Sequence, residues 1–330
     1  MERRRVVILV GGKSGEHDIS LASGAEVLRH VDRTRFDPAV LRVDRDGAWV
    51  FPESTEDVNA AGRRLTFAEG VMRLDALRPA AVFPLTHGPY GEDGHVQGLL
   101  DLLELPYVGS GLDASALCMN KARTRDVYRA NNLPVARGEE LRRGDRPSLS
   151  APCVVKPLRL GSSVGLDIAH DAEHLERALR VAFEHDDRVL IEDFVSGEEL
   201  TAGVLEELDG TARALPLVAI RPRTRAFFDL HAKYTPGATD EICPAPLDAA
   251  LTLRLQGYAI EAHRVLGCRA LSRTDMIVRP TGEVVLLETN TLPGFTRTSL
   301  LPQAACVAGR DYGRLVSHLL DHAIALGPRT

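Results

Sequence analysis

The chain has 330 residues, of which 44% are hydrophobic and 26% are charged, so it is long enough for two or three globular domains and excludes a disordered or fibrous protein. Its 40 basic and 46 acidic side chains give a formal net charge of -6, which excludes a broad basic surface for nucleic acid or an anionic membrane. No apolar run reaches the length of a membrane span, and the five apolar residues at 6–10 are too few for a secretory signal.

Cysteine usage indicates the compartment. The five cysteines are odd in number, scattered along the chain and never arranged as C-x-x-C. We therefore expect neither a disulfide framework nor a zinc site, and we expect a reducing cytoplasm.

The first third of the chain predicts a doubly wound α/β unit. Residues 5–10 form an apolar, β-branched run that ends in two glycines, and residues 20–28 follow with helical spacing. A second buried strand is expected at 80–85, and it leads into the loop HGPYGEDG, which begins with His87. Open α/β sheets bind ligands at the carboxyl ends of their strands, so His87 is a candidate site residue.

Two further units follow a glycine hinge near Gly109. We expect a domain boundary there, so the predicted domains are 1–109, 110–191 and 192–330. Elements predicted for the second unit are a helix at 113–131, a strand at 153–157, a helix capped by Asp171 and a strand at 188–194. Elements predicted for the third unit are β-rich stretches at 200–205, 213–220 and 276–288, a loop at 226–246 and a helix at 247–266.

The glycines after the first strand do not make a P-loop. Gly12, Lys13 and Ser14 resemble the end of a Walker A motif, but position 7, where that motif needs glycine, is valine. What remains is a glycine-rich turn with Glu16 close by. Either its backbone N–H groups bind an anion, or the glycines serve only to form the turn.

A second glycine loop follows a strand that carries a lysine. In VVKPLRLGSSVG, Lys156 lies at the strand end and Gly161, Ser162 and Ser163 form a small, hydroxyl-rich loop. Small residues let backbone N–H groups approach phosphate oxygens while a lysine supplies positive charge, and Lys121 is a second candidate cation. The alternative is that both lysines are ordinary surface residues.

The segment RTDMIVRPTGEVVLLETNTLPG carries the most specific pattern. Asp275 and Glu288 fall on two strands joined by a Pro-Thr-Gly turn, so a hairpin sets them side by side, with Asn290 on the same face. Two carboxylates and an amide oxygen suit Mg²⁺, and Arg273 on that face is placed to stabilise an oxyanion. The alternative is a solvated acidic hairpin.

The histidine pairs at 170 and 174 and at 318 and 322 have the spacing of one helix turn. No H-E-x-x-H glutamate accompanies them. We therefore interpret them as residues of helix surfaces and not as metal ligands.

Taken together, the blocks resemble the D-alanine-D-alanine ligases of the ATP-grasp superfamily. The resemblance runs over nearly the whole chain and rests on GGKSGEHDISLASG, HGPYGEDGHVQGLLDLLELPYVGSG, VVKPLRLGSSVGL, EDFVSGEELT, FFDLHAKY, SRTDM and LLETNTLPGFTRTSLLP. It implies a three-domain ATP-grasp fold with an N-terminal parallel sheet, cytoplasmic location, a homodimer, and two Mg²⁺ ions or Mn²⁺. It also implies ATP-dependent joining of two D-alanines for peptidoglycan synthesis, with ADP and phosphate released.

The same resemblance assigns roles to residues. Those it implies for ATP are the phosphate lysines Lys121, Lys156 and Lys233, the loop of Gly161, Ser162 and Ser163, the adenine hinge at Glu192, Phe194 and Val195, and the ribose contact Glu199. Those it implies for the amino acids are Glu16, Ser162, Tyr234 and His87 for the first D-alanine, Arg273 and the Gly294 N–H for the oxyanion, and Ser299 and Leu300 for the second subsite. The metal ligands it implies are Asp275, Glu288 and Asn290.

Three positions depart from the family pattern. Leu160 stands where many members have an acidic residue, Asn120 where aspartate is common, and Arg297 is unusual before Ser299. Retention of Tyr234 favours an amine as second substrate, because the related D-alanine-D-lactate enzymes lack it. Two alternatives stay open: a paralogue that joins D-alanine to another amino or hydroxy acid in secondary metabolism or antibiotic resistance, and a nucleotide-binding regulator without catalysis.

Overall fold

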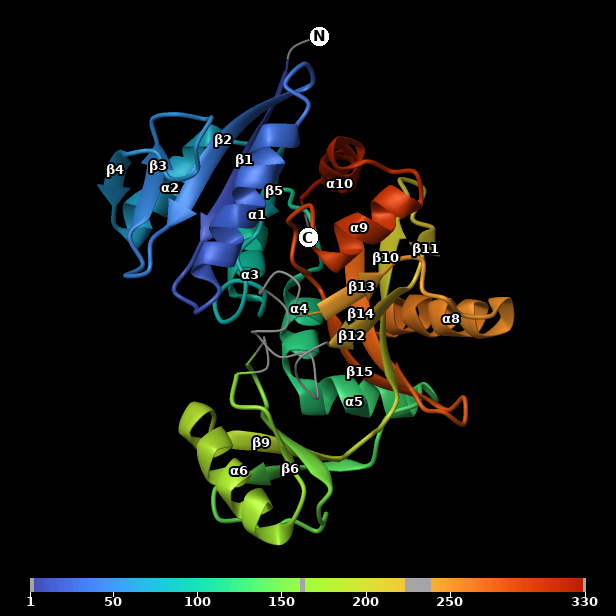
Figure 1. Cartoon of the computed structure of the whole chain (residues 1–330). Coiled ribbons are helices and arrows are strands. Elements are labelled where there is room, and N and C mark those ends of the chain that lie inside the picture. Colours follow the sequence, from blue (N-terminus) through green and yellow to red (C-terminus); the bar gives the residue numbers. More distant parts are fainter. Residues whose placement is uncertain (1–2, 161–163, 223–238, 329–330) are drawn as a thin grey trace.

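The computed structural model describes residues 3–160, 164–222 and 239–328. These residues form three sheets of five, four and six strands, and helices lie around and between them (Figure 1). None of the helices in this described part is long and apolar enough to cross a membrane.

The N-terminal sheet has a parallel centre and an antiparallel edge. Its strands in spatial order are β4 (Gly62–Leu65), β3 (Trp49–Pro52), β2 (Phe36–Val43), β1 (Arg4–Gly11) and β5 (Ala81–Pro84). Its helices are α1 (His17–His30), α2 (Phe67–Leu77) and α3 (His95–Leu102).

Alternate residues of β1 point into two different cores. Val6 and Ile8 pack with Val27 of α1 on one face, whereas Val7 packs with Leu74 of α2 on the other. This two-sided burial explains the continuous apolar run of β1 and confirms the doubly wound prediction. In the described part of the chain, the sheet is extended beyond β5 only by a single bridge between Tyr107 and Val82.

The central sheet is wholly antiparallel and small. Its strands in spatial order are β6 (Gly138–Arg142), β9 (Arg188–Asp193), β7 (Cys153–Pro157) and β8 (Asp167–Ala169). Helix α6 (Ala172–His185) covers one face, and the Asp171 carboxylate accepts the His174 N–H at its start, as predicted.

The C-terminal sheet is antiparallel and carries the hairpin predicted to hold the metal ligands. Its strands in spatial order are β13 (Thr239–Ile242), β12 (Val218–Pro222), β10 (Glu198–Glu206), β14 (Leu271–Val278) and β15 (Val284–Asn290), with β11 (Ala212–Ala214) paired to β10. Its helices are α8 (Ala249–Val265), α9 (Leu300–Val307) and α10 (Tyr312–Leu326). The N-terminal sheet packs directly on this unit, because the rings of Phe83 and Phe295 meet edge to face at 5.3 Å.

The single helix predicted over 113–131 is two helices. Helix α4 (Leu112–Met119) stops at Asn120, whose backbone is extended, and α5 (Lys121–Ala130) begins directly after it. The Asn120 side chain accepts the Arg123 N–H, the usual stabilisation of a helix start. On α5, the Tyr128 hydroxyl bonds the hydroxyl of Thr289 on β15 at 2.6 Å, so this helix is held against the C-terminal sheet.

The prediction that His318 and His322 lie on a helix surface is wrong. His322 is buried, and its Nε2 lies 3.3 Å from a carboxylate oxygen of Glu206. His318 donates to the Glu206 carbonyl at 2.7 Å. On the other side His263 of α8 contacts the same Glu206 carboxylate, so α8, β10 and α10 meet at this half-buried carboxylate.

The same prediction holds for His174, which is half-exposed on α6, but not for His170, which lies outside the helix. His170 is exposed and precedes α6, while His174 lies within the helix with its Nε2 3.0 Å from the Asp167 carboxylate. Within the described residues, neither pair belongs to a group of three histidine, cysteine, aspartate or glutamate side chains that could hold a metal ion.

Candidate active site

The hairpin of β14 and β15 sets Asp275 directly opposite Glu288, as predicted. A β-bulge lies beside this pair: Met276 pairs with Leu286, so Leu287 is the extra residue. Leu286 is buried in the core, and in a regular strand Glu288 would face the same way. The bulge therefore turns Glu288 out of the core and onto the face of Asp275.

Arg273 and Asp275 form a two-pronged ion pair on this face. The Arg273 Nε and Nη2 atoms each lie 2.8 Å from an oxygen of the Asp275 carboxylate. Thr201 of β10 donates to the same carboxylate at 2.5 Å, and the Asn290 amide nitrogen lies 3.3 Å from it. Both predicted neighbours, the oxyanion arginine and the amide ligand, thus converge on Asp275.

Lys121 connects the start of α5 with the hairpin and the second glycine loop. Its Nζ lies 3.6 Å from a Glu288 carboxylate oxygen and donates to the Leu160 carbonyl at 2.6 Å. The backbone of Leu160 makes this contact, so the apolar side chain at that position does not interrupt it. Asn120 gives α5 the N-terminal cap that an aspartate would also give, so this departure from the family pattern is neutral in the fold.

Lys156 is buried and paired with Glu192, which is also buried. Arg125 of α5 contacts the other oxygen of the same carboxylate. Beyond Glu192 the chain passes through half-buried Phe194 and buried Val195 to Glu199 on β10, and this segment connects the central and C-terminal sheets. Sequence reasoning missed Arg125, because nothing in its local pattern distinguishes it from a surface arginine.

Glu16 and His87 meet at the carboxyl ends of β1 and β5. A Cβ atom on Gly88, whose φ is +69°, would lie 3.1 Å from a Glu16 carboxylate oxygen, so this glycine leaves room for that carboxylate. His87 is buried, and its Nε2 has no hydrogen-bond partner among the described residues. Burial lowers the pKa of His87 despite the nearby Glu16, and a hydrogen bond to Leu292 ties it to the turn after β15. The N-terminal and C-terminal halves of the site are therefore in contact.

Glu92 is a site residue that sequence reasoning did not single out. Burial raises its pKa to about 8, and the carboxylates of Glu16 and Glu288 add to this, while the Gly88 N–H bonds its oxygen at 2.9 Å. Lys121 acts in the opposite direction. The only sequence signal was its place in the GEDG motif, which does not reveal burial.

Gly294 and Ser299 lie together after β15. A Cβ atom on Gly294 would be 3.2 Å from the Ser299 hydroxyl, which accepts the Thr296 N–H at 3.0 Å. Leu300 begins α9 and is buried in the core shared by the N- and C-terminal sheets. Five predicted site residues, Gly161, Ser162, Ser163, Lys233 and Tyr234, lie outside the described residues.

The donor set of the hairpin fits a magnesium ion. Asp275 and Glu288 are cross-strand neighbours, and the amide of Asn290 reaches the same carboxylate. Mg²⁺ prefers oxygen ligands of this kind, carboxylates above all. In the structure these carboxylates form ion pairs with Arg273 and Lys121.

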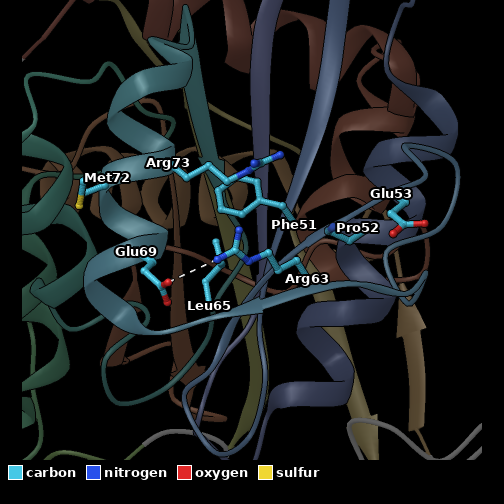
Figure 2. Close-up of a pocket in the computed structure, with 8 residues that line it drawn as sticks. All are labelled: Phe51, Pro52, Glu53, Arg63, Leu65, Glu69, Met72 and Arg73. Atoms are coloured by element: carbon cyan, nitrogen blue, oxygen red, sulfur yellow. Dashed lines mark ion pairs between the residues drawn. The ribbon is translucent and has the colours of Figure 1, made fainter.

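A surface pocket on the N-terminal sheet lies apart from these residues. It is formed by β3, β4 and α2 and lined by Phe51, Pro52, Glu53, Arg63, Leu65, Glu69, Met72 and Arg73 (Figure 2). The Arg73 guanidinium lies 4.8 Å from the centre of the Phe51 ring, and Arg63 pairs with Glu69 at 3.6 Å. Because β4 is the sheet edge opposite β5, this pocket takes no part in the site.

Comparison with protein families decides the assignment. The model of the D-ala D-ala ligase N-terminus matches residues 5–110, and that of the D-ala D-ala ligase C-terminus matches residues 134–321. The chain belongs to the D-alanine-D-alanine ligase family. It is therefore an ATP-dependent ligase with the ATP-grasp fold.

Full-length relatives of this ligase agree. The chain is 40% identical to a D-alanine--D-alanine ligase of Syntrophobacter fumaroxidans and 37% identical to a D-alanine--D-alanine ligase A of Mesorhizobium japonicum, with 98% of each chain covered in both cases.

Solved structures agree as well. The D-alanine-D-alanine ligase from Coxiella burnetii is 28% identical, with a TM-score of 0.83, over 98% of this chain and 94% of that one. The VanG D-Ala:D-Ser ligase from Enterococcus faecalis is 27% identical, also with a TM-score of 0.83, over 98% and 100%.

Proposed function

We propose that this ligase joins two D-alanines at the β14–β15 hairpin with ATP, for peptidoglycan precursor synthesis. The observation that carries the proposal is the convergence of Asp275, Glu288 and Asn290 with Arg273 on one face, beside Lys121. A regulator that only bound nucleotide would have no use for an oxyanion arginine beside the metal carboxylates.

Asp275, Glu288 and Asn290 would hold two Mg²⁺ ions or Mn²⁺. When bound, such ions neutralise charge on the phosphates of ATP. Lys121, Lys156 and Lys233 are proposed to supply positive charge to the phosphates of ATP, and Gly161, Ser162 and Ser163 to supply backbone N–H and hydroxyl donors. Glu192, Phe194, Val195 and Glu199 are proposed to hold the adenosine part of ATP.

The first step activates a carboxylate, which is a poor acyl donor on its own. An oxygen of the first D-alanine attacks the γ-phosphorus of ATP, the bond to the β-phosphate oxygen breaks, and ADP leaves an acyl phosphate behind. Glu16, with Ser162 and Tyr234, is proposed to bind and orient the ammonium of this D-alanine. The buried His87 Nε2, which lacks a partner among the described residues, is available to the same substrate.

The second step forms the peptide bond. The amine of the second D-alanine attacks the acyl carbon, and collapse of the tetrahedral intermediate expels phosphate. Arg273 and the Gly294 N–H are proposed to stabilise the oxyanion, a contribution of about 3 kcal/mol for one such donor. The hydrogen-bonded Ser299 and the adjacent Leu300 would line the second subsite.

Three broader features belong to the same proposal. We propose the domain division 1–109, 110–191 and 192–330, a homodimer, and a cytoplasmic enzyme. The exposed side chains of Tyr90 and Leu102 support an apolar dimer face near 87–106, and all five cysteines are free, as in a reducing compartment. Light scattering on the protein as it elutes from a size-exclusion column tests the dimer. A monomer mass at all micromolar protein concentrations would contradict it.

The experiment that tests the proposal is ADP release by the purified protein with ATP and Mg²⁺, with the product identified by mass. D-alanine is offered alone and mixed at equal concentration with D-serine, D-lactate and L-alanine. We expect D-alanyl-D-alanine as the main product of the mixture. A main product with D-serine or D-lactate would keep the ligase chemistry and overturn the substrate, and no ADP release with any of them would overturn the activity.

A further inference from the structure

Three charged side chains from three different elements meet in the interior of the molecule. Arg125 of α5, Lys156 of β7 and Glu192 of β9 expose only 2%, 7% and 6% of their surfaces. Arg125 and Lys156 each contact a different oxygen of the Glu192 carboxylate. Two buried cations therefore share one carboxylate.

We propose that Arg125 is a positioning residue of the ATP site, which holds Glu192 so that the charge of Lys156 stays available to the phosphates of ATP. Nothing in the family assignment gives Arg125 this role. The inference rests on the proposed ATP-binding function of Lys156 and Glu192.

The charges explain why the site needs a second cation. In a buried site a carboxylate and a lysine alone would neutralise each other, and ATP would then have to separate them before it gained the lysine. A guanidinium on the other carboxylate oxygen shares that negative charge and leaves a net positive charge among the three groups. A polyphosphate is the ligand that such a surplus favours.

The guanidinium is held in place by more than the carboxylate. Its Nη2 donates to the Ala136 carbonyl at 2.5 Å. On the adjacent strand, a Cβ atom on Gly138 would lie 2.2 Å from the Arg125 Nη1, so only glycine leaves room for the guanidinium there. Gly138 is also the strand partner of Glu192, which places this space directly beside the ion pair.

Helix α5 carries this arginine on the face that also serves the hairpin. Lys121, Arg125 and Tyr128 are spaced at i, i+4 and i+7, so they share one side of the helix. Lys121 lies near Glu288, and Tyr128 bonds Thr289 on β15. Arg125 therefore fixes the central-sheet lysine relative to a helix that is itself fixed to the metal-binding hairpin.

Binding of ATP with Mg²⁺, measured by calorimetry on the full-length protein, tests the inference. In Arg125→Met the Glu192 carboxylate pairs with Lys156 alone and neutralises its charge. We therefore expect ATP to bind at least about tenfold more weakly, on the scale of one buried charge pair. The KM for ATP should rise with it, whereas the KM for D-alanine should change by less than about twofold. Arg125→Lys restores a cation and should recover most of the affinity. Arg123→Met, on an exposed position of the same helix, is the matched control and should bind ATP like the wild type.

A double variant separates positioning from damage to the fold. If Arg125 acts through the Glu192 charge, Arg125→Met in a Glu192→Gln background should bind ATP as Glu192→Gln alone does. Wild-type affinity in Arg125→Met, or an equal loss in both backgrounds, would overturn the inference. Failure of the wild type itself to bind ATP would instead overturn the proposed function, so the two failures are distinguishable.

Discussion

The two sides of the site are built in different ways. On the C-terminal side, Arg273, Asp275, Glu288 and Asn290 belong to one hairpin, and short-range spacing places them together. On the central side, Arg125 and Glu192 are 67 residues apart and meet only because the Arg125 side chain extends from α5 to the central sheet. The local sequence pattern determines the first arrangement, and tertiary packing determines the second. Mutations on the two sides should therefore affect activity and stability to different extents.

The largest effect is expected on the hairpin. Glu288→Ala removes a carboxylate proposed to bind the metal, and we expect kcat to fall by about three orders of magnitude or more. The melting temperature should change little, because Glu288 is half-exposed. Mn²⁺ binding by the free protein should weaken in parallel. The control is Glu283→Ala in the turn of the same hairpin, which should keep activity within about twofold. Near-normal activity and Mn²⁺ binding in Glu288→Ala would contradict the metal assignment.

Glu206, half-buried at the end of β10 in the hairpin sheet, is the centre of a second long-range cluster. Burial alone would raise the pKa of Glu206 above its usual value of 4.5, but hydrogen bonds from His263, His322 and the Ala270 N–H outweigh burial and hold the pKa well below it. The carboxylate therefore contributes stability above about pH 4.5, and that contribution is lost as the pH falls below it.

Replacing this carboxylate tests the direction in which its contribution to stability changes with pH. Glu206→Gln should lower the free energy of unfolding by about 2 kcal/mol at pH 7, the scale of hydrogen bonds to a charged group. Urea unfolding of both proteins at a series of pH values should show this difference shrinking below about pH 4.5. A difference that stays constant or grows with acid would refute the assignment of the depressed pKa to Glu206.

Tyr128 connects the two sides, since its hydroxyl bonds Thr289, which lies between the proposed metal ligands Glu288 and Asn290. Tyr128→Phe leaves the Thr289 hydroxyl bonded to Thr274 at 2.7 Å, so the loss should be about 1 kcal/mol of unfolding free energy. Because α5 then holds the hairpin less firmly, kcat should also fall by a few fold. Tyr258→Phe, on α8, serves as the control. Unchanged stability together with unchanged kcat would show that this bond does not couple the two sides.

The smallest effect is expected at a purely local contact. Asn120→Ala removes the cap of α5 and should lower the free energy of unfolding by about 0.5 to 1 kcal/mol. Asn120→Asp should retain the cap and the stability. Denaturant unfolding measures both, and equal losses in the two variants would mean that the side-chain cap is not what Asn120 contributes.

These differences also show how far the sequence could be interpreted alone. The hairpin was predictable because a Pro-Thr-Gly turn and alternate spacing act over a few residues. Its bulge was not, because Leu286 and Leu287 are equally apolar and only the fold decides which of them is the extra residue. The break between α4 and α5 had a signal in Asn120, a preferred helix cap, which the helical spacing on both sides concealed.

Burial of charged groups was the part that the sequence concealed. Arg125 and His322 look like surface residues in their local contexts, but both are buried against a carboxylate that is distant in the chain. Glu92 also looks like a surface residue, yet burial of its carboxyl group raises its pKa. The roles assigned to all the site residues stay predictions, and those in the second glycine loop and at 233–234 lie outside the described residues.

The central claim is that a D-alanine carboxylate attacks ATP at this hairpin, and transfer of oxygen tests it most directly. D-alanine labelled with ¹⁸O in its carboxylate is turned over with ATP and Mg²⁺, and the released phosphate is analysed by mass. We predict one ¹⁸O atom in each phosphate, because the attacking oxygen stays with phosphorus when the peptide bond forms. Phosphate without the label would show that ATP is cleaved by another route and would contradict the account.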